Sequence, residues 1–585
     1  MSLLQPSVSV NPINVFYARE FQEYVMKSGR FAVIVLLLVC CVSVVLQTGQ
    51  RTTAATQEAA GSSASPAVTQ APSADAVAQA APVHNVPRIF FTDVESGPVT
   101  GGPNNMGVPI SIFGKGFGAE RRNSRVTIGG VEVASYVVWG VSNAHNKALD
   151  LIVVQPGPKV EAGPIVVSVN GDSSNSDFSF IANNGHVLYV ATNGADSSGC
   201  SQSSPCATIL HTIQAMKPGD TALVRGGKYA EGEIWVRASS SGTAKQAKVV
   251  KNYPGEEAYF TNPARDMLVD ADYITISGLN FQNGKGLQMT GWASRDQRGN
   301  RYINNTFSGT VNWAATETAG HDHVLAGNVC DIAGATTGTM GHCYYITQGS
   351  NLKILYNVAN GAPGYGIHIY EERRESSDFK RVIKDVLVEG NVLTGSRQRS
   401  GMIISVSDAG GYGNHVENIV VRNNIFAHNN HAGLLVSGAV QDLKVYNNTF
   451  FQNGRLGIYI ENDAKIKNVD IRNNLIYQTT NSVCAVDCSF FAQVHTIVGT
   501  APQNLTLSNN SYHPGAAHNS GVADKAPVSG AIRFADEAKL DLHLSPGAPV
   551  VRKGAALSSV PTDFDGRPRP QSAPSDIGAY QFIPQ

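Results

Sequence analysis

Five short segments that share one pattern recur between residues 343 and 461: CYYIT (343–347), GIHIY (366–370), GMIIS (401–405), GLLVS (433–437) and GIYIE (457–461). Successive side chains of a β-strand point to opposite faces, so alternation of this kind indicates a strand with one buried row. The buried row is predicted to hold Tyr344, Ile367, Met402, Leu434 and Ile458, with Ile346, Ile369, Ile404, Val436 and Ile460 two positions later.

The alternate positions of the same segments form the predicted outward row. It begins with Tyr345, His368, Ile403, Leu435 and Tyr459 and continues with Thr347, Tyr370, Ser405, Ser437 and Glu461. On stacked parallel strands such a row lines a long groove that suits a polymer chain. The outward row is therefore where we expect chemistry.

Asparagines mark a turn that recurs with these strands. They are Asn280, Asn305, Asn328, Asn357, Asn391, Asn424, Asn448, Asn474 and Asn510, at intervals of 25, 23, 29, 34, 33, 24, 26 and 36 residues. Six positions earlier stand the turn-forming residues Asp322, Asn351, Asp385, Asn418, Asp442, Asn468 and Asn504. Such intervals are typical of a solenoid, and stacked side-chain amides satisfy one another at equivalent turns. We predict an all-β chain with a right-handed parallel β-helix of about nine coils over residues 184–585.

Both ends of this region carry further motifs. LYVATNGADSSGC…SPCATILHTIQAMKPGDTALVRGGKYAEG spans residues 188–232, and LSPGAPVVRKG (544–554), TDFDGRPRP (562–570) and SDIGAYQF (575–582) follow near the end. The first segment resembles the entry of bacterial β-helix polysaccharide lyases, where a strand and a Gly-Asp turn lead to a capping helix. The later segments resemble the terminal part of exported bacterial β-helix proteins. The resemblance implies a β-helix, export from the cytoplasm and action on a polysaccharide.

Residues 87–183 show short apolar runs broken by glycine, among them ISIFGKGFG (110–118) and VTIGG (126–130). Alternating apolar residues with frequent turn signals predict a small immunoglobulin-like β-sandwich. The stretch resembles the IPT/TIG family, in which a strand ends in a G-x-G-F-G turn and V-x-I-G-G follows. The resemblance implies a spacer or a module that contacts a glycan or a protein.

The N-terminal part divides into three segments. Residues 1–30 are predicted to be cytoplasmic, and residues 31–47, with the run FAVIVLLLVCCVSVVL, to be a transmembrane signal-anchor. Basic residues precede the run and the upstream segment is long, which favours an uncleaved anchor over a cleaved signal. Residues 48–86 are rich in Ala, Ser, Thr, Gln and Pro and predict a flexible linker.

These features predict where the protein acts. The bulk of the chain is expected in the bacterial periplasm, held at the inner membrane by one N-terminal span, or secreted if the signal is cleaved. Envelope polysaccharide-export proteins are then candidate partners. The 44 basic and 45 acidic residues give a formal net charge of −1, and without a basic excess we expect no binding to nucleic acid.

Cysteine spacing fits an oxidising compartment. Four cysteines form two close pairs in turn-rich sequence, namely Cys200 with Cys206 and Cys484 with Cys488. In an exported chain each pair predicts a small disulfide-closed loop, and a four-thiolate zinc site is the alternative. The sequence leaves Cys330 and Cys343 open, either as buried thiols or as a third bridge.

Side chains that can carry chemistry converge on three successive coils. His368 and Tyr370 stand two positions apart on one predicted strand, so both point outward. The segment EERRESSDFKRVIKD (371–385) follows, and ten of its fifteen residues are charged. A charged loop beside a groove is a frequent carrier of function. The aromatic residues expected to contact substrate are His342, Tyr345 and Tyr365.

β-Elimination from a uronic acid needs a base for the C5 proton and a cation for the carboxylate. His368, Tyr370 and Lys380 are the candidate bases, and a neutral imidazole favours His368 as base with Tyr370 as acid. The residues expected to clamp the carboxylate are Arg373, Arg374, Arg397 and Arg399.

Hydrolysis is the alternative chemistry, and it needs two carboxyl groups ~5–5.5 Å apart in retaining enzymes or ~6.5–9.5 Å in inverting ones. Glu371 or Glu372 with Asp408, one coil on, meets these spacings because coils stack about 4.8 Å apart. The same three carboxylates are candidate Ca²⁺ ligands through hard-oxygen chemistry. Zinc at His321 and His323 is disfavoured, because His323 falls where other coils point apolar residues inward.

The sequence as a whole favours a polysaccharide lyase acting on an acidic exopolysaccharide. A glycoside hydrolase, a uronate epimerase and a non-catalytic glycan-binding or scaffold protein are the alternatives. Outward aromatic residues on stacked strands also form ladders that only pack, which is the plain structural interpretation of the same residues.

Overall fold

The computed structural model describes residues 86–261, 267–284, 286–289, 296–309, 314–332, 341–371, 382–407, 413–461, 463–477, 492–496, 502–513 and 522–584. Residues 1–85, which hold the predicted cytoplasmic and transmembrane segments and all but the last residue of the predicted linker, lie outside the described residues. Among the helices in the described ranges, none has the length and hydrophobicity to cross a bilayer. The described chain is all-β apart from helix α2 (Ile209–Ala215) and the 3₁₀ turns η1 (Pro103–Asn105), η2 (Ala238–Ser240) and η3 (Glu537–Lys539).

The predicted β-sandwich is present at the N-terminal end of the described chain. One sheet has the antiparallel order β1 (Arg88–Thr92), β3 (Ile110–Lys115), β7 (Asp150–Gln155) and β6 (Ser135–Ser142). The other has the order β2 (Ser96–Pro98), β10 (Ser179–Asn183), β8 (Ala162–Val169), β4 (Arg125–Ile128) and β5 (Val131–Glu132), with β9 (Asp172–Ser173) beside β8. Alternate residues of both sheets meet in one buried core that includes Ile112, Phe117, Val126, Ile152 and Phe180.

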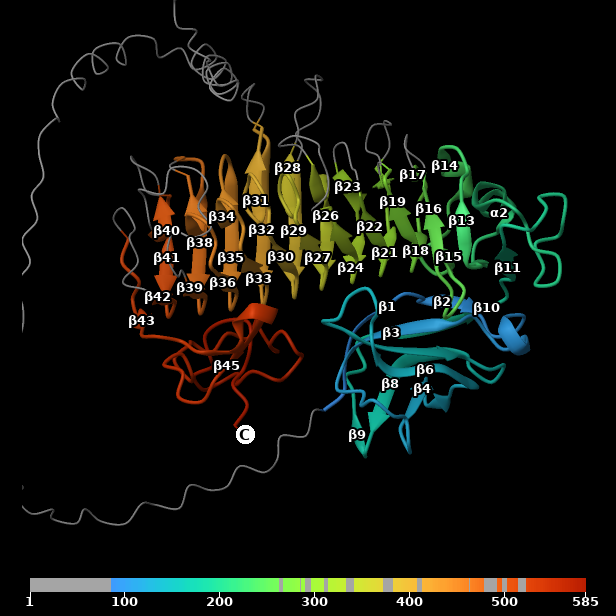
Figure 1. Ribbon diagram of the computed structural model, residues 1–585, viewed down its shortest axis with the longest axis horizontal. Coiled ribbons are helices and arrows are strands. Elements are labelled where there is room, and N and C mark those ends of the chain that lie inside the picture. Colours follow the sequence, from blue (N-terminus) through green and yellow to red (C-terminus); the bar gives the residue numbers. More distant parts are fainter. Residues whose placement is uncertain are drawn as a thin grey trace, which may run out of the picture. The chain divides into compact units, whose positions relative to one another are not determined.

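The predicted parallel β-helix follows, and its strands stack in sequence order on three faces (Figure 1). Face A holds β11 (Val187–Val190), β12 (Thr221–Val224), β15 (Lys248–Asn252), β18 (Ile274–Ser277), β21 (Arg301–Ile303), β24 (Val324–Ala326), the second half of β26 (His342–Leu355), β29 (Val382–Glu389), β32 (His415–Arg422), β35 (Val440–Tyr446), β38 (Lys467–Arg472) and β41 (Thr506–Ser508). Face B holds β14 (Ile234–Val236), β17 (Met267–Val269), β20 (Leu287–Met289), β23 (Ala314–His321), the first half of β26, β28 (Ile367–Glu371), β31 (Met402–Val406), β34 (Ala432–Val436), β37 (Leu456–Ile460) and β40 (Ala492–Thr496).

Face C completes each coil with short strands. It holds β13 (Gly227–Tyr229), β16 (Ala258–Phe260), β19 (Asn280–Gln282), β22 (Thr306–Ser308), β25 (Val329–Asp331), β27 (Val358–Asn360), β30 (Val392–Thr394), β33 (Ile425–Ala427), β36 (Thr449–Phe451), β39 (Leu475–Tyr477), β42 (Ser511–His513) and β43 (Val528–Ser529). All pairings on the three faces are parallel, as the repeat predicts. Helix α2 packs Ile209 and Ile213 against the first coils, which matches the predicted capping helix.

The predicted inward row fills the interior of the β-helix. Strand register aligns Ile367 with Met402 and Met402 with Leu434, and all three are fully buried. On face C, phenylalanine rings stack from coil to coil with centroids 5.3 Å apart. Each buried side chain of this size contributes ~1.5–3 kcal/mol, and most of its contacts are to neighbouring coils. Stacking is therefore what stabilises each coil.

A ladder of buried asparagines closes the turn between faces A and C. It consists of Asn305, Asn328, Asn357, Asn391, Asn424, Asn448, Asn474 and Asn510, none with exposed surface. Each side-chain oxygen accepts N–H groups from the coil before it. Asn357 Oδ1, for example, accepts Asn328 N at 3.0 Å and Asn328 Nδ2 at 2.9 Å. The predicted amide stacking is confirmed, and the geometry leaves no room for slippage because one rung fixes the next.

Both ends of this ladder are informative. At the last rung, Asp524 Oδ2 accepts Asn510 Nδ2 at 2.8 Å. At the first, the prediction was wrong by one residue: Leu279 N donates to Asn305 Oδ1, and Asn280 sits one position later on face C. Leu279 occupies the rung position, which the second asparagine holds in the later Asn-Asn pairs, and Asn280 aligns with the residue after the rung, Thr306.

A second ladder lies on the surface at the bends of the face A strands. Its members are Asp322, Asn351, Asp385, Asn418, Asp442, Asn468 and Asn504, with φ between 52° and 60°. Asn418 Nδ2 donates to Asp385 Oδ1 at 2.7 Å, and three further neighbouring pairs bond at 2.8–2.9 Å. Asn and Asp tolerate the left-handed region better than other non-glycine residues, which confirms their predicted role as turn formers.

A buried ion pair joins the sandwich to the β-helix within the compact unit 79–585. Lys251 Nζ lies 2.6 Å from Asp93 Oδ2, and neither side chain is more than 1% exposed. Lys251 donates to two further oxygens of the sandwich at 2.8 and 3.1 Å, and Ser277 Oγ donates to Asp93 at 3.0 Å. Phe90 stacks on Tyr356 nearby, with ring centroids 4.2 Å apart. The two domains thus share polar and apolar contacts.

The C-terminal segment, residues 522–584, packs on the later coils through β44 (Phe534–Asp536), β45 (Asp541–Leu544) and an apolar cluster with face C. Its backbone carbonyls accept hydrogen bonds from asparagines that each precede a ladder residue. These are Asn423, Asn447, Asn473 and Asn509. Asn-Asn pairs therefore do two tasks, because the first member docks this segment and the second forms the buried rung.

His543 in this segment lies between two carboxylates. Its Nδ1 is 2.5 Å from Asp541 Oδ1 and its Nε2 is 2.7 Å from Asp565 Oδ2. Because both ring nitrogens face acceptors, the ring carries two protons. Burial opposes this charge, but Asp565 and Asp541 outweigh it and raise the pKa of His543. The imidazolium links β45 to the loop that holds Asp565.

Two disulfides are present in the described residues. Cys200–Cys206 was predicted, and Cys330–Cys343 settles the pair that the sequence left open. Cys330 lies on β25 and Cys343 on β26, so this bridge ties face C of one coil to face B of the next. The predicted pair Cys484 and Cys488 lies outside the described residues.

Candidate active site

Five aromatic side chains from two adjacent coils form one group, which we call the aromatic–histidine cluster: His342, Tyr345, Tyr365, His368 and Tyr370. Strand pairing sets Tyr345 beside His368, and the two rings stack with centroids 4.4 Å apart. His342 approaches His368 edge-on at 4.3 Å, and Tyr370 lies 5.1 Å from His368. The structure therefore brings these predicted site residues together.

The outward row differs from the expected open groove because it is covered. Tyr345 is 1% exposed, His368 9% and Tyr459 8%. Large side chains on neighbouring strands lie about 4.8 Å apart, so each shields the next from water. An apolar cluster continues the row along the later coils and includes Tyr365, Ile403, Leu435 and Tyr459.

Both histidines of the cluster are neutral. His342 Nδ1 accepts the backbone N–H of Tyr365 at 3.0 Å, which leaves the ring proton on Nε2. Burial and the Arg399 charge lower the pKa of His342 to about 3. Burial, His342 and Arg399 hold the pKa of His368 well below its ordinary value. Within the described residues, His342 Nε2 and His368 Nδ1 have no hydrogen-bond partner.

Arg399 supplies the positive charge at the cluster. Its guanidinium lies close enough to Tyr365 to oppose the effect of burial, which raises the pKa of that hydroxyl. Of the other predicted clamp residues, Arg397 is exposed at the surface. Arg373 and Arg374 lie outside the described residues. Arg399 is thus the predicted clamp that the structure places beside the imidazoles.

The predicted carboxylates are placed differently. Glu371 pairs with Val406, on the same row as the buried Ile367 and Ile369, and has no exposed surface. Period two turns its side chain away from the face that carries Tyr370. Glu372, Asp408 and the candidate base Lys380 lie outside the described residues. The carboxylate pair for hydrolysis and the calcium site therefore stay predictions, with Glu371 turned to the inward row.

The second positions of the outward row form a polar line from Tyr370. Tyr370 pairs with Ser405, and Ser405 Oγ lies 2.7 Å from Ser437 Oγ. Glu461 follows on the next coil, where burial raises its pKa and a hydrogen bond with Ser437 opposes the rise. These hydroxyls give the cluster a polar edge beside its aromatic rings.

Sequence reasoning missed two basic residues beside the cluster. Arg399, His431 and Arg455 occupy the same position on three successive coils, and we call them the basic row. Each stands three positions before an inward residue, namely Met402, Leu434 and Ile458. Burial and the charges of Arg455 and Arg399 lower the pKa of His431 to about 4. The shared offset of three was the signal that could have found them.

The histidines considered for zinc are structural. His323 is fully buried, accepts Asn300 N at its Nδ1 and donates from Nε2 to Ala319 O at 3.1 Å. His321 Nδ1 lies 2.7 Å from Ser350 Oγ. The one metal-like grouping in the described ranges is Cys200 and Cys206 near His211, and those sulfurs are joined in a disulfide.

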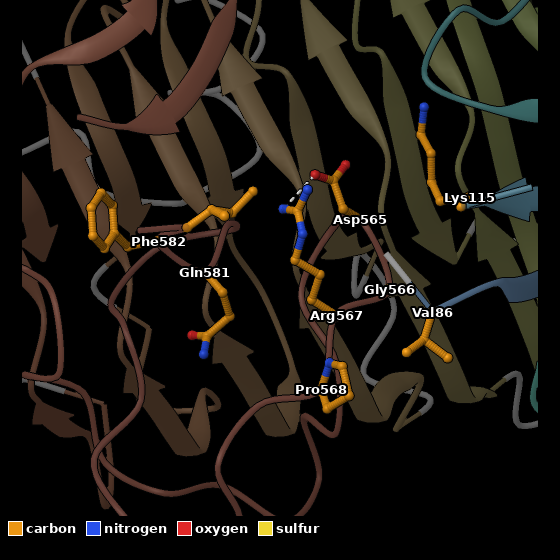
Figure 2. Close-up of a pocket in the computed structure, with 10 residues that line it drawn as sticks. Val86, Lys115, Asp565, Gly566, Arg567, Pro568, Gln581 and Phe582 are labelled. Atoms are coloured by element: carbon orange, nitrogen blue, oxygen red, sulfur yellow. Dashed lines mark ion pairs between the residues drawn. The ribbon is translucent and has the colours of Figure 1, made fainter. Parts of the chain in front are cut away.

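A cavity of about 230 Å³ lies where the sandwich meets the C-terminal segment (Figure 2). Lys115 lines it from β3, and Asp565, Arg567 and Phe582 line it from the C-terminal segment. Arg567 lies 2.7 Å from Asp565, and Lys115 lies 3.4 Å from Asp150. Its charged groups are thus held in ion pairs, Arg567 with Asp565 in the lining and Lys115 with Asp150 outside it.

Comparisons with known proteins agree with this architecture. The IPT/TIG domain matches residues 92–182, and the right handed beta helix region matches residues 383–523. No curated protein matches the sequence. Similar solved structures include pectate lyase Pel9A, with 14% identity, TM-score 0.45 and coverage of 68% of this chain and 96% of that chain. A rhamnogalacturonan lyase has 13% identity, TM-score 0.40 and coverage of 65% and 99%.

A third similar structure is the A-module of the Azotobacter vinelandii mannuronan C-5 epimerase AlgE6, with 13% identity, TM-score 0.32 and coverage of 55% and 94%. Together, the two matching domain families and the observed strands place an immunoglobulin-like module before a long parallel coil. The chain combines an IPT/TIG domain with a right-handed β-helix.

Proposed function

We propose that the chain is a carbohydrate-active enzyme that cleaves an acidic polysaccharide by β-elimination. The observation that carries the proposal is the neutral, buried imidazole of His368, which contacts the rings of Tyr345 and Tyr370 and feels the charge of Arg399. A base for a weakly acidic C–H proton must be unprotonated and must act beside a group that neutralises the adjacent carboxylate. The cluster offers both on adjacent coils.

In this mechanism His368 takes the C5 proton, and the electron pair of the C5–H bond forms the C4–C5 double bond. The C4–O bond breaks with its electrons on the glycosidic oxygen, which receives a proton from the Tyr370 hydroxyl. Arg399 binds the uronate carboxylate and stabilises the charge that develops on it. That carboxylate also offsets the Arg399 charge and so makes His368 a stronger base. Solvent then returns both side chains to their starting protonation states.

The same proposal places the folded part outside the cytoplasm. The two disulfides support an oxidising compartment. Together with the predicted N-terminal span, they favour a periplasmic enzyme anchored to the inner membrane. Envelope polysaccharide-export proteins remain its predicted partners.

A panel of acidic and neutral polysaccharides tests the activity. New reducing ends together with the ultraviolet absorbance of an unsaturated uronate are the expected result. Reducing ends without that absorbance indicate hydrolysis, and a change of uronate stereochemistry without new ends, seen by proton NMR, indicates epimerisation. Binding without any of these changes supports a scaffold role and overturns the proposed activity.

A further inference from the structure

The basic row extends the candidate site beyond a single sugar. We propose that Arg399, His431 and Arg455 form three consecutive carboxylate subsites, so that the ligand is a polymer with uronic acids at successive positions. The polymer lies along the axis of the β-helix, from the aromatic–histidine cluster towards β37. The inference rests on the proposed function for its choice of substrate, but it concerns binding and is measurable without turnover.

Backbone hydrogen bonds fix the spacing of the three side chains. His431 N donates to Arg399 O at 3.3 Å, and Arg455 N donates to His431 O at 2.7 Å. Their Cα atoms therefore repeat with the coil spacing of about 4.8 Å, which is about the length of one sugar ring in an extended chain. Carboxylates on every sugar match this period, and carboxylates on every second or third sugar do not.

Within the described residues, the two arginines of the basic row have no carboxylate counter-ion. In the described part of the chain, no carboxylate forms an ion pair with Arg399, His431 or Arg455, and the buried Nε of Arg455 has no hydrogen-bond partner. Arginines of similar exposure on face A are paired, since Arg422 lies 2.7 Å from Glu389 and Arg472 lies 2.7 Å from Asp470. A half-buried cation without a partner is costly, and a bound carboxylate removes that cost.

Glu461, an acidic side chain on the same face, forms no ion pair with the described residues of the basic row. Burial raises the pKa of Glu461, a hydrogen bond with Ser437 opposes the rise, and the Asp463 carboxylate adds to it. Burial and the charge of Glu461 raise the pKa of Tyr459, and the charge of Arg455 opposes the rise. Among the described residues, no ion pair joins Glu461 to the row, although its charge acts on Tyr365 and Tyr459 beside Arg399 and Arg455.

His431 adds a dependence on pH. The groups that face it are Arg399 and Arg455 on the flanking coils, the Ser400 hydroxyl at 3.1 Å and the Tyr459 ring at 5.5 Å. All are neutral or positive, so the free protein keeps His431 unprotonated. A ligand carboxylate beside His431 favours the protonated imidazole, so His431 takes up a proton when the ligand binds. Affinity for a uronate trimer is expected to rise as pH falls towards 5.

Calorimetry of the full chain with uronate monomers and trimers tests the proposal. The probes are galacturonate, glucuronate, mannuronate and guluronate oligomers, each beside its carboxyl-reduced counterpart. Arg455→Gln is expected to weaken trimer binding about tenfold or more and to leave monomer binding unchanged, because a hydrogen bond to a charged group is lost only at the third subsite. Arg472→Gln, which removes a paired charge from face A, is the matched control and keeps wild-type affinity.

The outcomes separate this inference from the proposed function. If no carboxylated trimer binds more tightly than its reduced counterpart, or if Arg455→Gln and Arg472→Gln behave alike, the three-subsite inference is overturned even where the wild-type chain cleaves an acidic polymer. If the trimer binds and Arg455→Gln weakens it while no polymer is cleaved, the inference stands and the lyase activity is overturned.

Discussion

Replacing Asn391 with alanine removes one rung of the buried ladder. Its side chain takes part in five hydrogen bonds of 2.8–3.1 Å, to Asn357, Ile354, Glu389 and Asn424. Alanine leaves the Asn357 N–H and a neighbouring carbonyl buried without a partner. Each such group costs ~1–3 kcal/mol, so the two together lower the free energy of unfolding by ~2–6 kcal/mol. Urea unfolding followed by circular dichroism measures the loss.

The surface ladder supplies the control. Asn418→Gly removes one exposed hydrogen bond of 2.7 Å to Asp385, and glycine adopts the φ of 52° without strain. We expect a loss of under ~1 kcal/mol. If Asn391→Ala costs no more than Asn418→Gly, the ladder does not carry the stability assigned to it. Both the midpoint and the slope of unfolding are needed, because a broken rung can split a solenoid into two unfolding units.

Further predictions concern the cluster, the C-terminal segment and the domain interface. His368→Ala and Tyr370→Phe should each lower polysaccharide turnover by about 10²-fold, the scale for losing a general base or acid, while His321→Ala keeps it; equal rates in all three would exclude the proposed roles. The pKa of His543 is higher in the folded chain than in the unfolded chain, where it is ~6.5. Its protonated ring therefore stabilises the fold fully below pH ~6.5, and this stabilisation is lost as pH rises through the folded-state pKa. His543→Gln should therefore flatten the fall in melting temperature as pH rises above ~6.5; parallel curves would contradict this. Lys251→Met leaves the carboxylate of Asp93 buried without its partner and should lower the free energy of unfolding by ~3–5 kcal/mol, measured by thermal unfolding. The stability of the wild-type chain should change little in 1 M salt, because the pair is buried.

The β-helix was predictable because its decisive signals are local and repeated. Each coil carries its own inward residues and its own buried asparagine, so the same assignment is supported independently by several repeats. The error at Asn280 arose where the first coils lack the Asn-Asn pair. The Cys330–Cys343 bridge was not predictable, because its partners are close only after face C and face B have folded around the interior.

The candidate site was predictable in part. Period two alone placed His368 and Tyr370 on one face, and stacking brought Tyr345 beside them. The same rule, applied one residue further, puts Glu371 on the inward row. The cover over the row and the pKa of His368 depend on packing between coils, which a strand pattern does not contain. His431 and Arg455 were missed because they lie at bends just before the strands, outside the alternating pattern from which the site was predicted.

The buried asparagine ladder has an electrical consequence. All its amide groups point the same way, with the oxygen towards the preceding coil and the N–H towards the next, so their dipoles add along the axis as peptide dipoles do in an α-helix. The positive end of this array emerges at Asn510, where the Asp524 carboxylate accepts both N–H groups. The negative charge of Asp524 thus lies at the positive end of the asparagine ladder. Because hydrogen bonds in a chain polarise one another, this charge also strengthens bonds between asparagines that Asp524 does not contact.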